Sequence, residues 1–588
     1  MITRESGVLQ GNNMAGDFFS LSTFEMLEKM EEEMRIHEAL HNDDYMNEKA
    51  NPGSLTAFYD DIFLAAVPKV INSMADRIEV IMIEHGSTMN KAKSGITGKE
   101  AEDWDGTPVD WPINTEGTIV LGAYIGNDHF KKSKLDEKVE KLKPPTQALQ
   151  LLKAGTQYAL ISKCISQKLA YSVRTARNMK DIAEQADIFD RQIGEEIARI
   201  AQTDYTGTVA QIIKIPRRNG CLGVTPTGRL EAEAAIITSR IHHKQYMATY
   251  RPDKLQQAQN TIINAEIVLG ESDDVVEMTG IEPHVLLTLT TVNAQRILGA
   301  GKKKVYTDMA AKLITELGVH DDTRQQAAFL LSASGTTAST FFLGSSIGSE
   351  TDVYFPEVDW ILALRRFFGV GIINNEPEYR VCACGESYTS STNKYHAELC
   401  MRNQGLRTTL HNLIVALLYR LLKKMNPQAG AEDILTEQNV GQIVTPNPLG
   451  GQNVRDVRAD IIYRKEAQRK IIDVAVANPV GKENLAYPIE SHKRLDAVAM
   501  SKEKRKRNHY RRVSQPTPIP ETDVIPFVLE TTGRLGPSAL LFLHSVCGTQ
   551  TYRRTIFINE CALLCARYAG KILSATRTRF SITPQNGG

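Results

Sequence analysis

The chain has 588 residues, of which 42% are hydrophobic and 23% are charged, a composition typical of a globular protein with roughly three or four domains. Lysine and arginine number 69, as do aspartate and glutamate, and this balance excludes a uniformly basic nucleic-acid coat while allowing local patches. No apolar run approaches about 18 residues, so no membrane-spanning helix is predicted. The N-terminus has neither a signal-peptide core nor a transit pattern.

The first stretch, residues 1–134, combines a loop and helix with hairpin patterns. The loop contains Gln10 and Gly11; such a loop lets the backbone approach a phosphate or base, although an ordinary connection has the same pattern. Apolar residues on both sides of Asp60 and Asp61 predict a hairpin with these acids at its tip. Adjacent acids repel each other unless a cation lies beside them, and a solvated turn is the alternative.

The middle of the chain is predicted to be mostly helical. Apolar residues at helical spacing indicate one helical domain over 135–210 and a helical linker domain over 211–375. Within the linker, residues 355–370 predict a core helix in which Arg365 and Arg366 are exposed to solvent.

Residues 376–430 carry a pattern of metal ligands followed by a helix. The four candidate ligands are Cys382, Cys384, His396 and Cys400. Cysteine thiolates and imidazole in a short window suit tetrahedral Zn²⁺, and Gly385 supplies a permissive backbone for the turn. The alternative is four unrelated residues in a reduced protein. Because three of the eight cysteines belong to this motif, we expect a reducing compartment.

Residues 431–515 contain two strand patterns that each carry one acid. Asp460 follows Arg458 and Ala459, and Asp473 interrupts the apolar run 471–476. A carboxylate in a buried strand is costly unless it binds a metal or a partner. Two acids on adjacent strands offer what Mg²⁺ needs beside a phosphate, so we expect a metal-dependent nuclease site here.

A basic run follows these strands and precedes the last segment, 516–588, which is predicted to be a C-terminal helical extension. The cations singled out are Lys502, Lys504, Arg505, Lys506 and Arg507. The run could be a solvated helix face or a nuclear-localisation patch. Beside a nuclease core, phosphate binding is the preferred interpretation.

The order of these motifs resembles that of non-LTR retrotransposon proteins, in which a reverse transcriptase precedes a zinc knuckle and a restriction-like endonuclease. The motifs are a Gln-Gly loop, Phe-x-Asp-Asp, a Leu-Gly hairpin at 117–126, Cys-x-Cys-Gly…His-x3-Cys, a His-Asn helix start, Arg-x-Asp and Ile-Asp-Val-x-Val-x-Asn-Pro. The resemblance implies an α/β plus α protein with a partial palm over 1–134, a thumb over 135–210 and a helical linker over 211–375. It further implies a zinc knuckle over 376–430, a restriction-like core over 431–515 and a helical extension over 516–588.

The resemblance also implies roles in a polymerase site. Asp60 and Asp61 would hold catalytic Mg²⁺ or Mn²⁺, and Gln10 and Gly11 would lie at the nucleotide and template. The family's first catalytic aspartate precedes the Gln-Gly loop. This chain starts at Met1, just before that loop. We therefore expect a polymerase half that is inactive alone, unless a second polypeptide supplies the missing strand.

In the nuclease half the resemblance assigns the metal to Asp460 and Asp473. The usual nuclease lysine, two residues after the second acid, is replaced by Ala475. In the related retroelement nucleases the lysine lies on a following helix before a tyrosine. Lys506 fits that position best, and Lys502 is the alternative.

Three functions are consistent with the sequence. The first is the C-terminal part of a retrotransposon protein that binds RNA and DNA, nicks DNA and primes RNA-templated synthesis. The second is a domesticated, inactive scaffold or RNA-binding subunit of a larger ribonucleoprotein, and the third is a zinc-stabilised DNA-binding protein. We expect an intracellular protein without a membrane partner. A nuclear location is favoured, or a mitochondrial one for a ribonucleoprotein scaffold.

Overall fold

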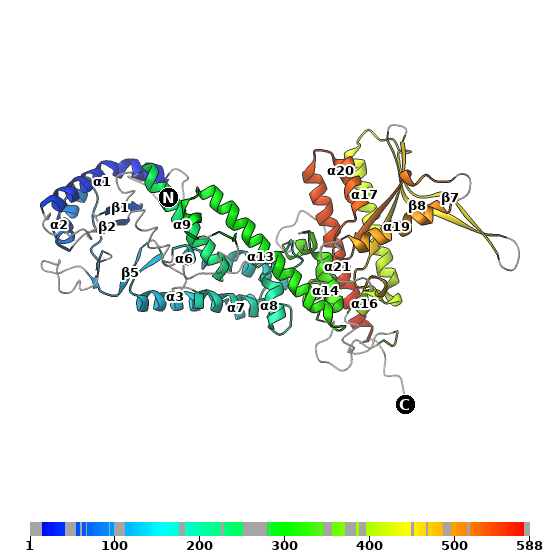
Figure 1. Cartoon of the computed structure of the whole chain (residues 1–588), viewed down its shortest axis with the longest axis horizontal. Coiled ribbons are helices and arrows are strands. Elements are labelled where there is room, and N and C mark those ends of the chain that lie inside the picture. Colours follow the sequence, from blue (N-terminus) through cyan, green and yellow to red (C-terminus); the bar gives the residue numbers. More distant parts are fainter. Residues whose placement is uncertain are drawn as a thin grey trace, which may run out of the picture.

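The protein is a mixed α/β molecule that is mostly helical, described here from a computed structural model. It is elongated, with the N-terminal helices at one end and the largest sheet at the other (Figure 1). No helix in the described part of the chain is both long and apolar enough to cross a bilayer. The structure describes residues 15–40, 54–58, 61–65, 68–92, 94–98, 112–120, 122–175, 183–224, 229–250, 279–281, 283–336, 338–344, 355–370, 384–386, 395–447, 452–465, 468–485, 496–513 and 518–580.

The N-terminal end consists of two helices and a hairpin. These elements are α1 (Ala15–Leu40), β1 (Ser54–Phe58), β2 (Asp61–Ala65) and α2 (Pro68–Glu84). The strands are antiparallel with Phe58 opposite Asp61, so the predicted hairpin is confirmed. Asp61 begins β2, and nothing is described of its side chain. Asp60, Gln10 and Gly11 lie outside the described residues, so their predicted roles stay predictions.

The remaining N-terminal strands are short and form two further pairs. They are β3 (Ile96–Thr97), β4 (Ile113–Asn114), β5 (Gly117–Val120) and β6 (Ala123–Gly126). The second predicted hairpin is confirmed as β5–β6. Within the described residues of the N-terminal part the strands form three separate two-stranded ladders. Each hairpin has its own packing partner: Ile62 and Leu64 pack on the core of α1 and α2, whereas Tyr124 packs on the helical body.

The helical body fills the middle of the molecule. Its elements are α3 (Asp128–Leu142), α4 (Thr146–Leu149), α5 (Ala154–Leu160), a π-helical turn (Ile161–Ile165), α6 (Ala170–Thr175), α7 (Ala183–Ile200), α8 (Gly207–Lys214), α9 (Arg229–Tyr250), α12 (Pro283–Thr288), α13 (Thr291–Val319), α14 (Arg324–Ala333), a 3-10 turn (Ala338–Leu343) and α15 (Glu357–Arg365). One hydrophobic core joins Ile197 of α7 to Phe329 of α14 and Trp360 of α15. The boundary predicted at 210/211 therefore does not separate two cores.

The two arginines at the end of α15 are buried, so the expectation that they are exposed is wrong. Arg365 is 3% exposed and donates to the carbonyl oxygens of Ala201 and Gln202 at 3.1 and 2.7 Å. Arg366 is 5% exposed and forms a two-point pair with Glu398 at 2.7 and 2.9 Å. A buried guanidinium needs such partners because its charge loses its hydration.

The C-terminal part is built around a four-stranded sheet. Its elements are α16 (His396–Leu399), a 3-10 turn (Met401–Asn403), α17 (Gln404–Met425), β7 (Ile434–Pro446), β8 (Gln452–Lys465), β9 (Gln468–Ala477), α18 (Lys482–Leu485), α19 (Ala497–Arg511), a 3-10 turn (Glu521–Asp523), β10 (Val524–Glu530), α20 (Pro537–Cys547) and α21 (Thr551–Phe580). The strand order is β10-β9-β8-β7, with β10 parallel to β9 and the other pairs antiparallel. The segment 516–588, predicted to be helical, therefore also supplies an edge strand.

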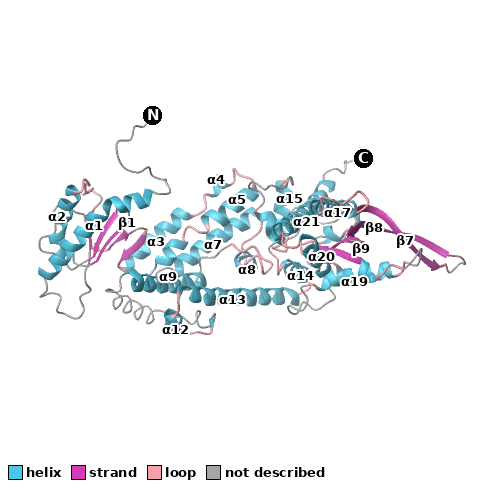
Figure 2. Cartoon of the chain, turned by 90° about the horizontal axis from the view of Figure 1, so that it is seen from above, coloured by secondary structure: helices cyan, strands magenta, loops and turns pink. Residues whose placement is uncertain are grey.

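Helices cover both faces of this sheet. On one face, α17, α20 and α21 share a core with Ile461 and Phe527. On the other face, α19 packs through Ala499 and Tyr510. Helix α21 also packs on α15, so it joins the sheet to the helical body (Figure 2). This arrangement places α17 and α19 on either side of β8 and β9, the strands that carry the predicted acids.

Candidate active site and candidate metal centre

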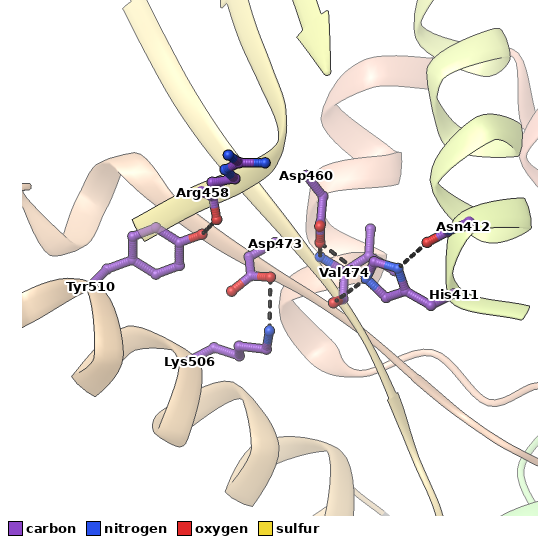
Figure 3. A network of polar contacts seen from close by, with 8 residues as sticks. All are labelled: His411, Asn412, Arg458, Asp460, Asp473, Val474, Lys506 and Tyr510. Carbon is purple, nitrogen blue, oxygen red and sulfur yellow. Dashed lines mark hydrogen bonds and ion pairs between the residues drawn. The ribbon is translucent and has the colours of Figure 1, made fainter. Parts of the chain in front are cut away.

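Asp460 and Asp473 lie side by side on neighbouring strands, as the sequence predicted. Ile461 of β8 is the register partner of Ile472 of β9, so the two acids occupy the next position along the ladder. Figure 3 shows both carboxylates between α17 and α19. The carboxylates are close enough to share a hydrogen bond when one of them is protonated. Two contacting carboxylates are stable together only with a proton or a cation between them, and their hard oxygens fit Mg²⁺ or Mn²⁺.

Asp460 is held by donors from α17 and β9. Its Oδ2 accepts from the backbone N–H of Val474 at 2.6 Å and lies 3.3 Å from Nε2 of His411. The same imidazole nitrogen is 3.2 Å from the carbonyl oxygen of Val474. The hydrogen bond to Asp460 raises the pKa of His411 to about 9, so the ring is an imidazolium at neutral pH. Burial opposes ionisation of Asp460, but the bond from His411 and its charge outweigh burial and lower the pKa of this carboxyl.

Asp473 is the more buried of the two acids, at 5% exposure. Its Oδ1 accepts a hydrogen bond of 2.8 Å from Nζ of Lys506. Burial raises the pKa of Asp473 to about 6; the charge of Lys506 opposes this rise and the charge of Asp460 adds to it. One turn beyond Lys506, the Tyr510 hydroxyl donates to the carbonyl oxygen of Arg458 at 3.1 Å and so fixes α19 against β8.

The structure places Lys506 rather than Lys502 in contact with an acid. Lys502 lies one turn earlier on α19, and burial, followed by the charges of Lys506 and Arg505, lowers its pKa. Ala475 is 5% exposed and packs with Ala499 of α19, so a lysine at that position would have to displace the helix. The cation near Asp473 therefore comes from α19 because β9 has no room for it.

The other predicted phosphate-binding residues point in different directions. Lys502 and Arg505 line the cleft described below, and Arg505 also lies 3.9 Å from Glu483. Lys504 is exposed and is not part of the cleft lining. Arg507 donates to the Ser538 hydroxyl at 2.5 Å, where α20 begins, so it ties two helices together and its predicted role in nucleic-acid binding is not supported by its position.

The candidate metal centre lies at the start of α16. Sγ of Cys384 is 3.1 Å from Nε2 of His396, and the ligand atoms of Cys384, His396 and Cys400 all lie within 4.8 Å of one another. Two thiols and an imidazole at this separation fit Zn²⁺. The expected backbone at Gly385 is confirmed by its φ of +93°. The fourth predicted ligand, Cys382, lies outside the described residues.

Two arginines fix the segment that carries two of these ligands, His396 and Cys400. Arg407 donates to the carbonyl oxygens of Glu398, Leu399 and Cys400 at 3.0 to 3.1 Å. The buried pair between Arg366 and Glu398 ties the same segment to the helical body. A cluster held by two rigid neighbours keeps its ligand geometry before a metal arrives, which favours metal affinity.

A cleft of about 1510 Å³ extends from the metal-ligand cluster to His411 and Lys506, the side chains that contact Asp460 and Asp473, but the two acids themselves are not among its lining residues. At one end it is lined by the metal-ligand cluster, and at the other by His411 and by Lys506 of α19. The cationic residues along its wall are Arg324, Arg402, Arg407, Lys482, Lys502, Arg505 and Lys506. They outnumber the acids of the lining, so a chain with zero net charge still presents a positive cleft.

Some site residues were not predicted. The sequence indicated His411 only as part of a His-Asn helix start and gave it no role in the site. Its position beside Asp460 depends on the packing of α17 on the sheet. Glu503 stands inside the basic run, yet it is 3% exposed and accepts from Ser538 of α20 at 3.0 and 2.6 Å. Glu503 also forms an ion pair with Arg507 on the same helix. The spacing of four residues between them was the sequence signal that could have predicted this pair.

No protein-family model and no curated protein matches this chain. Fold and site together define a mixed α/β protein, mostly helical, with a candidate zinc centre of two cysteines and one histidine.

Proposed function

We propose that the C-terminal sheet and its helices form a divalent-metal-dependent endonuclease that nicks DNA, as in the retroelement nucleases that the motifs resemble. The observation that carries this proposal is the placement of Asp460 and Asp473 on adjacent strands, one position beyond the pair Ile461 and Ile472, with Nζ of Lys506 2.8 Å from Oδ1 of Asp473. A bound Mg²⁺ or Mn²⁺ would polarise the scissile phosphate and lower the pKa of an attacking water. The expectation for the polymerase half, RNA-templated DNA synthesis together with a second polypeptide, belongs to the same proposal and rests on the resemblance alone.

Each side chain has a distinct task in this scheme. Asp460 and Asp473 would hold the metal, and His411 keeps Asp460 oriented and ionised. The ammonium of Lys506 would stabilise the charge that develops on the phosphate, because it is already fixed beside Asp473 by packing of α19. Lys502 and Arg505 would hold neighbouring phosphates along the cleft. The zinc cluster would keep the far wall of the cleft in place.

A second candidate function is a nucleic-acid-binding scaffold without cleavage, a domesticated subunit of a ribonucleoprotein. The observation in its favour is that the acid pair is already neutralised by the side chains of the protein. His411 pairs with Asp460 and Lys506 pairs with Asp473, so the site is stable without a metal. The charged cleft would serve both functions.

A nicking assay on supercoiled plasmid with Mg²⁺ or Mn²⁺ separates the two functions. We expect the wild-type protein to produce nicked circles and Asp473→Asn to lose that activity while DNA binding changes less than about threefold, since phosphate contacts carry most of the affinity. The Asn variant retains the shape of the side chain and so tests the metal ligand. DNA binding by the wild type without nicking under either metal would favour the scaffold.

A further inference from the structure

The strands β7 and β8 extend well beyond the sheet as a two-stranded ribbon. The ribbon is defined here as residues 438–446 of β7 paired with residues 452–459 of β8. The ladder between β8 and β9 covers only 461–465 on β8, so nothing in the sheet pairs with the ribbon. At about 3.4 Å per residue the ribbon is about 27 Å long. It projects away from the body at the end of the molecule (Figure 1).

The base of the ribbon is rigid. Val440 and Val457 are buried in a core that also contains Tyr510 of α19. The Tyr510 hydroxyl donates a hydrogen bond of 3.1 Å to the carbonyl oxygen of Arg458. Tyr510 lies one helical turn, about 6 Å, beyond Lys506 on the same helix. The ribbon therefore starts beside the candidate active site and has a fixed direction relative to it.

The ribbon carries side chains suited to DNA rather than to a protein core. Gln452, Asn453 and Arg455 are exposed on β8, and Gln442 of β7 donates to Asp456 at 2.8 Å. Amide side chains bind adenine edges and arginine binds guanine edges or phosphate. An apolar ribbon with free edges would aggregate, whereas in this one polar side chains are interspersed with Ile443, Val444 and the exposed Val454.

A positive field connects the ribbon to the active-site helix. Burial lowers the pKa of His509, and the charges of Lys506, Arg455 and Arg512 lower it further. Lys506 lies on α19, Arg512 caps the end of this helix, and Arg455 belongs to the ribbon, so three cations surround the neutral ring of His509. A phosphate backbone that reached Lys506 would thus pass cations on α19 before it met the ribbon.

We propose that this ribbon binds in the major groove of duplex DNA on one side of the cleavage site. The inference rests on the proposed nuclease function, and it adds a binding surface to it. The major groove, about 12 Å wide, admits a two-stranded ribbon whose strands are about 4.8 Å apart, whereas the minor groove is only about 6 Å wide. In duplex RNA the major groove is deep and narrow, so the ribbon fits DNA. The part of the ribbon beyond its buried base, residues 442–446 and 452–456, is about 17 Å long, which corresponds to about five base pairs at 3.4 Å each.

The test is DNA binding by a protein with a shortened ribbon, measured without Mg²⁺ or Mn²⁺ so that cleavage plays no part. Gln442 and Asp456 are cross-strand partners, so replacing residues 443–455 by Asn-Gly closes a tight hairpin and leaves the buried base intact. Arg455→Ala is the point variant. Arg469→Ala is the matched control, because this exposed arginine of β9 is paired with Arg464, at the end of β8 that is far from the ribbon.

The probes are random-sequence DNA duplexes of 12 and 30 base pairs and an RNA duplex of 30 base pairs. We expect the shortened ribbon to weaken binding to the long DNA about tenfold and to the short DNA less than twofold. Arg455→Ala should weaken long-DNA binding about threefold and reduce the salt slope by about one, while Arg469→Ala leaves both unchanged. Equal losses on both DNA lengths, equal binding to the RNA duplex, or no loss would overturn the proposal.

The two proposals fail separately. Binding that depends on the ribbon, without nicking of plasmid by the wild type, would leave the ribbon assignment standing and remove the nuclease. If the shortened protein nicked plasmid at the wild-type rate and bound long DNA with unchanged affinity, the nuclease proposal would stand and the ribbon proposal would be removed. Sedimentation of the wild type and the shortened protein serves as a third measurement, since a dimer lost on shortening would assign the ribbon to self-association.

Discussion

Nζ of Lys506 lies 2.8 Å from Oδ1 of Asp473, although the two residues are 33 positions apart and belong to different elements. The contact depends on the connection between the parallel strands β9 and β10, which contains α19 and passes over one face of the sheet. It supplies a fixed ammonium beside a buried carboxylate. Four predictions follow from this site and from the interactions that support it.

Lys506→Ala should reduce plasmid nicking by about 10²- to 10³-fold, because the fixed charge that stabilises the transition state is removed. DNA affinity should fall only slightly, since one phosphate contact is lost. The matched control is Lys504→Ala, which removes an exposed lysine from the same helix. An equal loss of activity in both variants would mean that overall helix charge, rather than the position of Lys506, matters.

Purified protein should contain one Zn²⁺ per chain by elemental analysis. His396→Ala and Cys400→Ala should each lose it, because both remove a ligand from the cluster. Cys164→Ala, at an exposed cysteine of the π-helical turn, is the control and should keep the metal. Cys382→Ala decides between three and four protein ligands: full zinc content in this variant would contradict the sequence-based four-ligand motif.

Arg366→Ala should destabilise the protein by about 3–5 kcal/mol, because Glu398 would be left as an unpaired buried charge. Chemical denaturation measures this change. The double variant Arg366→Met with Glu398→Leu should recover most of the stability, since it removes both charges together. The exposed Arg402 provides the control, as Arg402→Ala should change little. A double variant as unstable as the single one would show that packing dominates at this site.

The stability of the protein should depend on pH through Glu530, which is 1% exposed. Burial raises its pKa to about 7, despite hydrogen bonds from Ser332 and from the backbone N–H of Ala499. A carboxyl whose folded pKa is raised stabilises the fold below its unfolded pKa of about 4.5, and this contribution is lost as pH rises through about 7.

Glu530→Gln stays neutral at every pH, so it should be more stable than wild type at pH 8 by on the order of 3 kcal/mol, and about equal at pH 4.5. The measurement is the difference in unfolding free energy between variant and wild type from pH 4.5 to 8, which cancels other titrating groups. Glu432→Gln, at an exposed position, is the control. A difference that does not change with pH would refute the assignment.

The sequence predicted the parts of the fold that depend on local pattern. Both N-terminal hairpins, the buried strand with Asp473 and the turn at Gly385 were correct, because periodicity and turn residues determine them. Of the two lysines considered, Lys506 is the one that contacts Asp473, and its catalytic role stays a prediction.

The remainder required long-range packing. The sequence around Arg366 predicts a surface residue, because its partners Glu398 and the ring of Phe329 are distant in the sequence and reach it only in the folded protein. Likewise, the last segment was predicted to be a helical extension, although its residues 524–530 pair in parallel with β9 as β10. His411 carried no signal of its own, since a histidine near a helix start is ordinary and its partner Asp460 lies 49 residues away.

The position of α21 has a consequence for synthesis of the protein on the ribosome. Leu563 and Ala566 of this last helix belong to the same core as Tyr158 and Trp360. Helices α21 and α15 are in close contact at Gly570, where any side chain would clash with the backbone of Asp359. The helical body therefore lacks one wall until the ribosome has synthesised α21, which begins at residue 551, 186 residues after the end of α15 at residue 365. At about 5–20 residues per second, its core stays exposed for many seconds before α21 arrives, and a chaperone could bind it in that interval.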